Sequence, residues 1–447
     1  MVKPISREKN RSQKSFYQIT FGCQMNKHDS QRLAGLLVQK GYQAAPHLDG
    51  ASIIIFNTCC VRGSAEQRLY GRVASLKSLK RENPGLIIAV GGCLAQNEGR
   101  KLIENYPHID VVFGTQNLPR LPELIEKAVK DSASVCELTD EPQIMTTELP
   151  LLRKSSFQAW VGITQGCDNF CSYCIVPSVR GREVSRYPAE IREEVEKLAG
   201  EGVKEVTLLG QNVNSYGRGL NASFAGLLEE LSEIPGIERI RFTTSHPRDL
   251  SSDIIETVAS AERICEHFHL PLQAGSDRIL RLMNRGYDQG AYLGLIRRIR
   301  EKIPTASITT DIMVGFPSET EDDFEETLKV VDAARFDQAF TFIFSPRIGT
   351  KAYHMDNQVS DAVKSERFQR LVKAQEEISL QKNNLLLGRA EEVLAEGKSR
   401  KDPSILSGRT RTNKVVNFPG EESLLGKTIT VTIKKVHNHS FSGVPVT

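Results

Sequence analysis

Short apolar runs alternate along the chain with stretches in which apolar residues recur every three or four positions. Residues 15–131 contain four such runs, SFYQITFGC, ASIIIFNTC, LIIAVGGC and IDVVFGTQN. Their β-branched and aromatic content predicts strands, and the spacing in intervening stretches such as DSQRLAGLLVQKGY predicts helices. This alternation predicts a small parallel α/β domain over residues 15–131.

Six further runs predict a larger α/β domain over residues 157–383. They are FQAWVGIT, KEVTLLG, IERIRFTT, EHFHLPLQ, ASITTDIMVG and DQAFTFIFS, with helical stretches such as AEIREEVEKLAGEG between them. Six βα units predict an open, partial (βα)6 barrel. A polar or glycine-rich patch follows every strand, which is the layout of a site at the carboxyl face of a barrel. Turns are polar in any protein, so a functional interpretation needs further support.

The remaining segments complete a predicted α/β chain of three domains. Residues 132–156 lack periodicity and are predicted to be a linker. ERFQRLVKAQEEISLQKNNLLLG predicts a long amphipathic helix that ends at Gly388. Alternation in KTITVTIKKV predicts a small β-barrel over residues 384–447, and residues 1–14 are predicted to be a basic, flexible terminus.

Composition argues against a membrane-spanning protein and against a disulfide-stabilised one. Of 447 residues, 39% are hydrophobic, and no apolar run approaches the roughly 20 residues that a membrane helix needs. Nine cysteines, an odd number in a chain this long, do not indicate a disulfide scaffold. We therefore expect a cytoplasmic protein with no membrane partner.

The net charge of +3 is unevenly distributed, and both ends of the chain are basic. Residues 1–14 carry five Lys/Arg against one Glu, and residues 389–447 carry ten Lys/Arg against six Asp/Glu. These ends are either solvated surfaces or positive patches that meet a polyanion such as RNA. Charge alone leaves both interpretations open.

Three cysteines in the loop GCDNFCSYC carry the clearest chemistry. Cys167, Cys171 and Cys174 fall within eight positions directly after the first strand of the predicted barrel. A structural zinc site usually takes four ligands as two CxxC pairs, whereas soft thiolates suit iron–sulfur clusters. A cubane cluster held by three cysteines leaves one iron open to a small molecule. Structural cysteines and partial zinc binding are the alternatives.

Cysteines also end the first three strands of the N-terminal domain. Cys23, Cys59 and Cys93 are spaced by 36 and 34 residues. Each alone is more often a buried small hydrophobe, but the carboxyl ends of parallel strands share one edge, where three thiols form a second three-cysteine site. Neighbouring side chains in an extended segment point opposite ways, so Cys60 is expected to face away. We predict that Cys60, Cys136 and Cys265 are not ligands.

These motifs resemble those of a known family. CDNFCSYC resembles the CxxxCxxC motif of radical S-adenosylmethionine (SAM) enzymes, and FGCQMNKHDS, NTCCVRGSAEQ and GGCLAQ resemble the N-terminal motifs of the methylthiotransferase family among them. Nearly the whole chain is covered, because that family joins an auxiliary-cluster domain, a radical SAM domain and a C-terminal TRAM domain. The resemblance implies two [4Fe-4S] clusters, one on Cys167, Cys171 and Cys174 and an auxiliary one on Cys23, Cys59 and Cys93.

The resemblance also implies an activity. TTSHP and HLPLQAGSDRILRLMNRGY are similar to the branch that converts N6-isopentenyladenosine at tRNA position 37 to 2-methylthio-N6-isopentenyladenosine. One SAM donates the methyl group and a second is the source of a 5′-deoxyadenosyl radical. The implied partners of a monomeric enzyme are the tRNA anticodon stem-loop and a flavodoxin- or ferredoxin-type electron donor. Alternative substrates are threonylcarbamoyl-adenosine in tRNA or a ribosomal protein aspartate, and the non-enzyme alternative is an iron–sulfur RNA-binding protein.

Further site residues are expected at the strand ends of the barrel and in the basic tail. Each has a structural alternative, as a turn residue, a helix cap, a core aromatic or a surface histidine. Expected SAM contacts are Tyr173, Gln211, Asn212, Asn214, Ser276, Val314 and Gly315; expected substrate contacts are Ser245 and His246; expected RNA contacts are Lys398, Arg400, Lys401, Arg409, Arg411 and Lys414.

Overall fold

The computed structural model describes residues 14–60, 63–139 and 149–446. The chain forms two compact units, one of Met1–Lys154 with Val176–Gly181 and one of Ser155–Ile175 with Arg182–Thr447. The predicted basic terminus lies outside the described residues except for Lys14. Among the described residues, no helix is long and apolar enough to cross a membrane.

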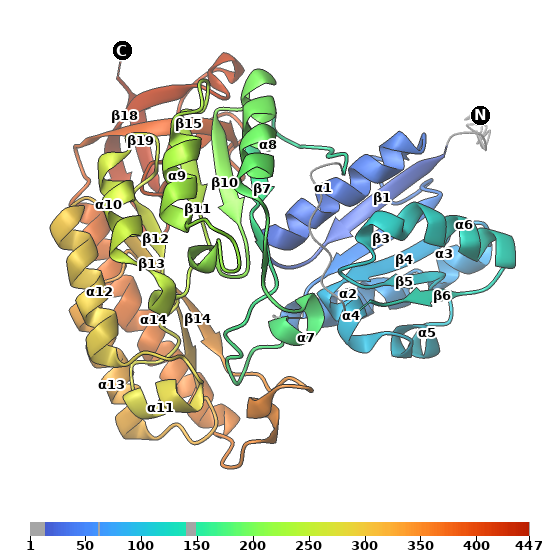
Figure 1. Ribbon diagram of the computed structural model, residues 1–447, viewed down its shortest axis with the longest axis horizontal. Coiled ribbons are helices and arrows are strands. Elements are labelled where there is room, and N and C mark those ends of the chain that lie inside the picture. The colour runs from blue at the N-terminus through green and yellow to red at the C-terminus, as the bar shows by residue number, and fades with distance from the viewer. Residues whose placement is uncertain (1–13, 61–62, 140–148, 447) are drawn as a thin grey trace, which may run out of the picture. The chain divides into compact units, whose positions relative to one another are not determined.

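The first unit is built on a six-stranded parallel sheet with the order β2-β1-β3-β4-β5-β6 (Figure 1). The strands are β1 (Ser15–Thr20), β2 (Gln43–Ala44), β3 (Ile53–Thr58), β4 (Ile87–Gly92), β5 (Val111–Phe113) and β6 (Val135–Glu137). Every residue of β3 and β4 is buried, as expected for central strands of a parallel sheet that are covered on both faces. The predicted parallel α/β domain is confirmed.

Helices surround this sheet. They are α1 (Gln24–Gln39), α2 (Gly63–Ser75), α3 (Lys77–Glu82), α4 (Cys93–Glu98), α5 (Lys101–Asn105), α6 (Leu121–Asp131) and, from the distant segment, α7 (Val176–Arg180). The expectation that residues 132–156 are only a linker is wrong at β6, which pairs with β5. A strand of three residues is too short to show a period of two. The predicted domain boundaries themselves stay predictions.

The second unit contains the six strands of an open barrel. The strands β7 (Gln158–Gly162), β10 (Glu205–Leu209) and β11 (Arg239–Phe242) form one parallel sheet, and β12 (His267–His269), β13 (Ser307–Val314) and β14 (Gln338–Ile343) form another. A parallel bridge links Ile240 of β11 to Ile264, which lies three residues before β12. Within the described chain β7 and β14 do not pair with each other. The predicted partial barrel is therefore confirmed.

Helices and short strands complete the barrel. Its helices are α8 (Pro188–Gly200), α9 (Phe224–Ser232), α10 (Ser252–Ser260), α11 (Asp277–Leu282), α12 (Gln289–Lys302), α13 (Glu321–Ala334) and α14 (Asp361–Asn384). Alternate residues of β13 such as Ile308 and Ile312 are fully buried in the core that packs against these helices. Thr309 and Asp311, which alternate with them along the strand, therefore face the barrel interior. The strands β8 (Thr164–Gln165) and β9 (Val184–Ser185) pair with each other.

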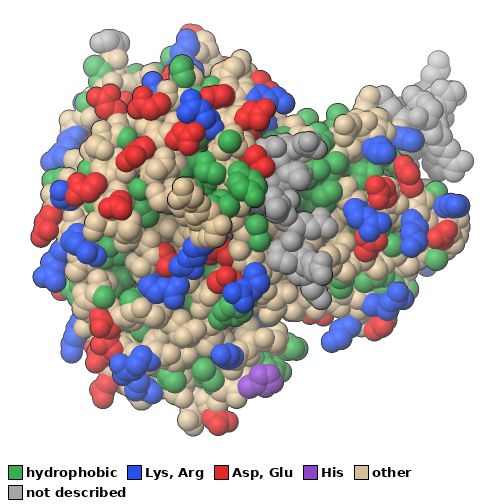
Figure 2. All heavy atoms as spheres, in the orientation of Figure 1, with side chains coloured by type: hydrophobic (Ala, Val, Ile, Leu, Met, Phe, Trp, Pro, Cys, Tyr) green, Lys and Arg blue, Asp and Glu red, His purple; other side chains and the backbone are tan. Residues whose placement is uncertain are grey.

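A closed five-stranded barrel ends the chain, as predicted. Its strands follow the order β15-β16-β17-β19-β18, with the bounds β15 (Ala390–Lys398), β16 (Leu406–Thr410), β17 (Val415–Phe418), β18 (Thr428–Val436) and β19 (Phe441–Pro445). Gly388, with φ of +78°, lets the chain turn after α14, and its N–H donates to Ile433 O at 2.9 Å. The face in Figure 2 carries Lys and Arg side chains interspersed with Asp and Glu.

Candidate metal centres and active site

The first unit brings the three predicted thiols to one edge of its sheet. Cys23 directly precedes α1, Cys59 follows β3, and Cys93 follows β4 as the first residue of α4. The strands β1, β3 and β4 are neighbours, so their carboxyl ends lie side by side. A hydrogen bond joins the side chains of Cys23 and Cys59. Cys23 is exposed, whereas Cys59 and Cys93 are buried.

Cys60 joins this group of thiols. Its side chain is buried and hydrogen-bonds to Cys93. The expectation that Cys60 faces away from Cys59 and its site is therefore wrong. Strict alternation holds only within a strand, and β3 ends at Thr58, with a bend at Cys60.

Two glycines allow the cysteine-bearing turns to approach one another. Gly22 has φ of +121°, and a Cβ there would lie 2.3 Å from Cys59 Cβ. Gly92 has φ of +93°, and a Cβ there would lie 2.4 Å from Asn57 Oδ1. Both positions exclude other residues, because they combine a left-handed backbone with a close contact.

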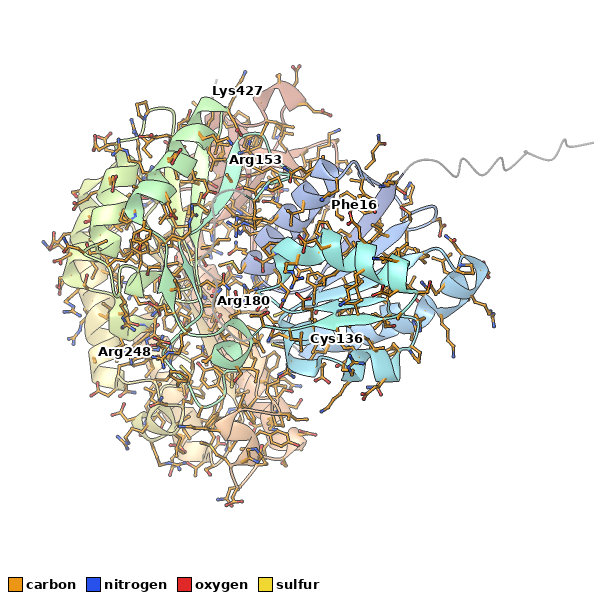
Figure 3. The ribbon with its side chains drawn as sticks, turned by 45° about the vertical axis from the view of Figure 1, so that its right-hand side comes forward. Phe16, Cys136, Arg153, Arg180, Arg248 and Lys427 are labelled. Carbon is orange, nitrogen blue, oxygen red and sulfur yellow. The ribbon has the colours of Figure 1, made fainter. Side chains whose placement is uncertain are left out.

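A buried arginine lies beside these thiols. Arg180 projects from α7 (Figure 3), and its Nε–H donates to Cys93 Sγ at 3.3 Å. Its Nη2 donates to Asp29 Oδ2 at 2.7 Å and to Asn26 Oδ1 at 3.1 Å. The hydrogen bond with Cys59 and the charge of Arg180 lower the pKa of Cys23 to about 6. The site thus favours thiolates, which are the form that binds metal.

These residues fit an iron–sulfur cluster better than a single ion. In the part of the chain that the structure describes, no three His, Cys, Asp or Glu side chains are arranged around one ion position. Each cysteine of a cluster binds a different iron, so its ligands are spread more widely than those of one ion. A buried cation beside several thiols also matches a group that carries negative charge.

The second three-cysteine site lies in the loop between β8 and α7. Cys167 and Cys171 are buried, and Cys174 is half-buried. Asn284 Nδ2 donates to Phe170 O at 3.0 Å, and Gln211 Oε1 accepts from Gly166 N at 2.6 Å. Burial raises the pKa of Cys167 to about 11, so its deprotonation needs a metal or another compensating charge.

Arg285 is a functional candidate that the sequence analysis missed. Its Nη1 lies 3.3 Å from Cys171 Sγ and 3.3 Å from Tyr173 Oη, and its Nη2 donates to Pro271 O at 2.9 Å. It is buried with its charge directed at the loop. The arginine lies 114 residues from Cys171 in sequence, so no local pattern connects them. Tyr173 packs beside the small hydrophobic cluster that contains Met283.

Two of the residues expected to contact SAM, Asn212 and Ser276, form hydrogen bonds within the chain. Asn212 Nδ2 donates to Asp249 Oδ2 at 2.6 Å, and Asn212 Oδ1 accepts from His246 N at 3.1 Å. Ser276 is the N-cap of α11 and donates to Asp323 Oδ1 at 2.6 Å. Ser276 thus has the role of a helix cap, and its expected contact with SAM stays a prediction.

The strand end after β13 holds Val314 and Gly315. Val314 is buried in the core. Gly315 has φ of +73°, and its N–H donates to the carboxylate of Glu319 at 3.1 Å. A Cβ on Gly315 would lie 2.3 Å from Lys364 Cγ. Its backbone donor is thus used within the chain, and its expected approach to a nucleobase stays a prediction.

Three polar side chains at the strand ends carry atoms that have no hydrogen-bond partner among the described residues. They are buried, and the atoms concerned are both amide atoms of Asn214, Ser245 Oγ and His246 Nε2. Burying polar atoms without partners is costly. Burial also lowers the pKa of His246 to about 2, so its imidazole is neutral. This group fits a polar ligand that supplies the missing hydrogen bonds.

A second polar group lines the barrel interior, and the sequence analysis did not identify it. His269 Nδ1 lies 3.0 Å from Thr309 Oγ1, and His269 Nε2 lies 3.5 Å from Asp311 Oδ1. The ring of Phe340 contacts His269 edge-on at 5.9 Å between centroids, and 45% of the Phe340 side chain is exposed. These residues come from three neighbouring strands, so their side chains form one continuous surface.

The six expected RNA contacts divide into two groups. Arg411 Nη2 donates to Glu266 Oε1 at 2.6 Å, Lys414 Nζ lies 3.1 Å from Asp337 Oδ1, and Arg409 Nε lies 3.3 Å from Glu396 Oε2. Arg411 and Lys414 thereby hold the C-terminal barrel against the larger one. In contrast, Lys398, Arg400 and Lys401 are exposed, and of these Lys398 Nζ lies 2.5 Å from Glu422 Oε1.

An open six-stranded barrel with three cysteines after its first strand defines the radical SAM class. Residues 161–331 match the radical SAM superfamily, residues 15–114 match the uncharacterized protein family UPF0004, and residues 385–446 match the TRAM domain. A tRNA-2-methylthio-N(6)-dimethylallyladenosine synthase of Carboxydothermus hydrogenoformans is 50% identical over 97% of this chain and 100% of its own. That of Caldicellulosiruptor saccharolyticus is 51% identical over 97% of this chain and 93% of its own. This chain belongs to that family of synthases.

A solved structure shows the same fold at low sequence identity. The radical SAM methyltransferase TsrM from Kitasatospora setae superposes with a TM-score of 0.54 and 13% identity, covering 76% of this chain and 74% of TsrM. At this identity the likeness concerns the fold alone.

Proposed function

We propose that this chain is a radical SAM methylthiotransferase that converts N6-isopentenyladenosine at tRNA position 37 to 2-methylthio-N6-isopentenyladenosine. The isopentenyl group is the dimethylallyl group in the names of the relatives. The observation that carries the proposal is the pair of three-cysteine sites, each at the carboxyl edge of a parallel sheet, in a chain with 50% identity to such a synthase. One SAM is the methyl donor and a second is the radical source.

Two [4Fe-4S] clusters are part of this proposal. Cys167, Cys171 and Cys174 would hold one, and Cys23, Cys59 and Cys93 would hold the auxiliary one. When bound, the first cluster supplies the electron that cleaves SAM, which gives access to the unactivated C2–H bond of adenine. The protein provides orientation and excludes water.

Side chains of the second unit have different roles in holding the cluster and the ligand. The Arg285 guanidinium compensates the charge of the Cys171 thiolate. The unpartnered polar atoms of Asn214, Ser245 and His246 are donors and acceptors for a buried polar ligand. His246 Nδ1 accepts from Arg248 N at 3.3 Å, so Nε2 of the neutral imidazole carries the proton and donates one hydrogen bond without repelling the sulfonium charge of SAM.

Transfer RNA is the proposed substrate. The exposed Lys398, Arg400 and Lys401 of the C-terminal barrel would contact phosphates, which gives affinity without reading sequence. The target adenine must leave its stack to meet the reactive carbon. We further propose a cytoplasmic monomer that receives electrons from a flavodoxin- or ferredoxin-type donor.

The test is an anaerobic assay on the reconstituted chain. The protein is supplied with iron, sulfide, reductant, SAM and tRNA that carries or lacks the isopentenyl group, and digested nucleosides are measured by mass spectrometry. Methylthio-isopentenyladenosine formed only from prenylated tRNA is the expected result. The matched control is the C167A/C171A/C174A variant, which should form neither this nucleoside nor 5′-deoxyadenosine.

Two other outcomes would contradict the proposal. Release of 5′-deoxyadenosine without a methylthio nucleoside would leave a radical enzyme with another substrate, so threonylcarbamoyl-adenosine tRNA and the ribosomal protein would be tested next. Binding of tRNA without any cleavage of SAM would favour a non-catalytic iron–sulfur RNA-binding protein.

A further inference from the structure

Cys93 receives hydrogen bonds from two residues that have no assigned role in the proposed reaction. Arg180 Nε–H donates to Cys93 Sγ at 3.3 Å, and the thiol of Cys60 also hydrogen-bonds to Cys93. Both donors are buried. The sulfur environments at this edge are therefore unequal, with a cation and a thiol directed at one particular cysteine.

The orientation of Arg180 is fixed by other partners. Its Nη2 is held by Asp29 Oδ2 at 2.7 Å and by Asn26 Oδ1 at 3.1 Å, which leaves Nε directed at the sulfur. The backbone of α7 is anchored separately, because Thr115 Oγ1 donates to Val179 O at 2.6 Å and Gln116 Nε2 donates to Arg180 O at 3.1 Å. The guanidinium is thus not needed to keep the helix in place.

A purely structural ion pair between Arg180 and Asp29 does not explain this arrangement. Such a pair needs no thiol, and a buried ion pair is weak evidence for stability. Hydrogen bonds from charged donors are about twice as strong as neutral ones. Donors to a ligating sulfur withdraw negative charge from it, which stabilises the reduced form of an iron–sulfur cluster.

We infer, on the basis of the proposed function, that Arg180 and Cys60 are positioning residues of the auxiliary site that raise the reduction potential of the cluster bound there through their hydrogen bonds to Cys93. Arg180 acts through a charged N–H donor and Cys60 through a weaker S–H donor. Neither residue is an iron ligand. The arrangement makes the auxiliary site electronically distinct from the one at Cys167, Cys171 and Cys174, where Arg285 faces Cys171.

The experiment isolates the auxiliary cluster in the C167A/C171A/C174A full-length chain. Its midpoint potential is measured by redox titration followed by electron paramagnetic resonance (EPR), in this parent and after adding R180Q, R180K, C60A or C60S. The expected result is a more negative potential for R180Q, partial recovery in R180K, a smaller negative shift for C60A and recovery in C60S, which retains a donor. C136A is the matched control and should leave the potential unchanged, because Cys136 lies on β6, which β5 separates from β4 in the sheet.

The outcomes separate this inference from the proposed function. A parent chain that binds no cluster would contradict the two-cluster proposal, whatever the variants do. A parent that binds a cluster, with unchanged potentials in R180Q and C60A, would overturn the inference alone. If R180Q fails to bind iron, the C60A and C60S pair decides, because those substitutions leave the Arg180 contacts intact.

One more result would overturn the role of Cys60. If the EPR spectrum of the parent does not respond to added methanethiolate and that of C60A does, Cys60 is itself a ligand that closes the open iron. A hydrogen-bonding Cys60 instead predicts that both proteins respond equally.

Discussion

Two buried arginines, Arg180 and Arg285, each direct a guanidinium N–H at a cysteine sulfur from 3.3 Å. They lie 87 and 114 residues from those cysteines in the sequence. A buried guanidinium needs compensating negative charge, and in both cases the thiolates of a bound cluster would provide part of it. Each three-cysteine site therefore has its own buried arginine beside one of its sulfurs.

Replacing Arg285 by Gln should weaken the barrel site. The substitution leaves Pro271 O without its charged donor and removes the charge beside Cys171, which should cost about 2 kcal/mol of unfolding free energy. Formation of 5′-deoxyadenosine should fall about 10-fold to 100-fold. Thermal unfolding and a SAM-cleavage assay measure the two effects. Arg281→Gln, at an exposed position of the same segment, is the control and should change neither.

The neutral His246 makes stability depend on pH. Burial lowers its pKa in the folded protein to about 2, below the usual unfolded value of about 6.5. The unfolded chain therefore binds more protons as the pH falls, and stability is lost. Between pH 7 and pH 5 this one residue should remove about 2 kcal/mol.

Denaturant unfolding of the wild type and of His246→Gln at both pH values checks this. The variant should lose about 2 kcal/mol less than the wild type between pH 7 and pH 5. His267, which is also buried with a lowered pKa, is retained in both proteins and so cancels. Equal losses in the two proteins would show that His246 is protonated in the folded state.

At the scale of elements, strand ends and the glycines beside them determine where the chemistry lies. The turns after β1, β3 and β4 place thiols next to one another because the strands are parallel neighbours. Gly22 and Gly92 allow the turns to touch. The site is therefore a product of register and close backbone approach rather than of any single helix or strand.

Replacing Gly22 by Ala should disrupt the auxiliary site. The new Cβ would lie 2.3 Å from Cys59 Cβ at a backbone φ of +121°, and the strain should cost about 2 kcal/mol. Iron bound by the C167A/C171A/C174A chain should fall in the G22A variant. Gly50→Ala is the matched control, since Gly50 has φ of +92° with nothing within 4 Å of the new Cβ. Equal iron content in the two variants would contradict the role of the close contact.

A feature of the fold or of the site was predictable from the sequence when the residues that indicate it lie within one short segment. The runs that became β3, β4 and β13 are long enough to show their apolar content, and the cysteines end such runs, so both sheets and both thiol groups were predictable. The strands β2 and β6 have two and three residues and gave no signal. Arg180, Arg285 and the bend that turns Cys60 inward depend on contacts between distant segments, which no spacing reveals.

At the scale of the whole molecule, the C-terminal barrel is fixed to the larger barrel within the second unit. Arg241 on β11 donates to Thr410 O at 2.8 Å and to Arg411 O at 2.9 Å, and Arg239 donates to Glu392 at 2.7 Å. Within the tail itself, Arg411 pairs with Glu266 and Lys414 pairs with Asp337. The formal charge of the tail overstates what is left for RNA.

Substitutions in the two groups of basic residues should have opposite effects. Lys401→Ala should weaken tRNA binding and reduce the slope of affinity against salt by about one, because it removes one phosphate contact. Arg411→Ala should leave that slope unchanged and lower the unfolding temperature, because it breaks the pair with Glu266. Binding titrations at several salt concentrations and thermal unfolding measure these effects. The reverse pattern would place the RNA surface at Arg411.

The first unit is discontinuous in sequence, because α7 belongs to it although it follows Ile175 of the second unit. A ribosome that has synthesised Lys154 has not yet supplied the helix that carries Arg180. The thiol-bearing edge is therefore completed only after the first barrel strand and the whole GCDNFCSYC loop have been translated. Completion of this edge therefore depends, through chain order, on synthesis of Cys167, Cys171 and Cys174, and a fragment cut at residue 154 would lack the cation that faces Cys93.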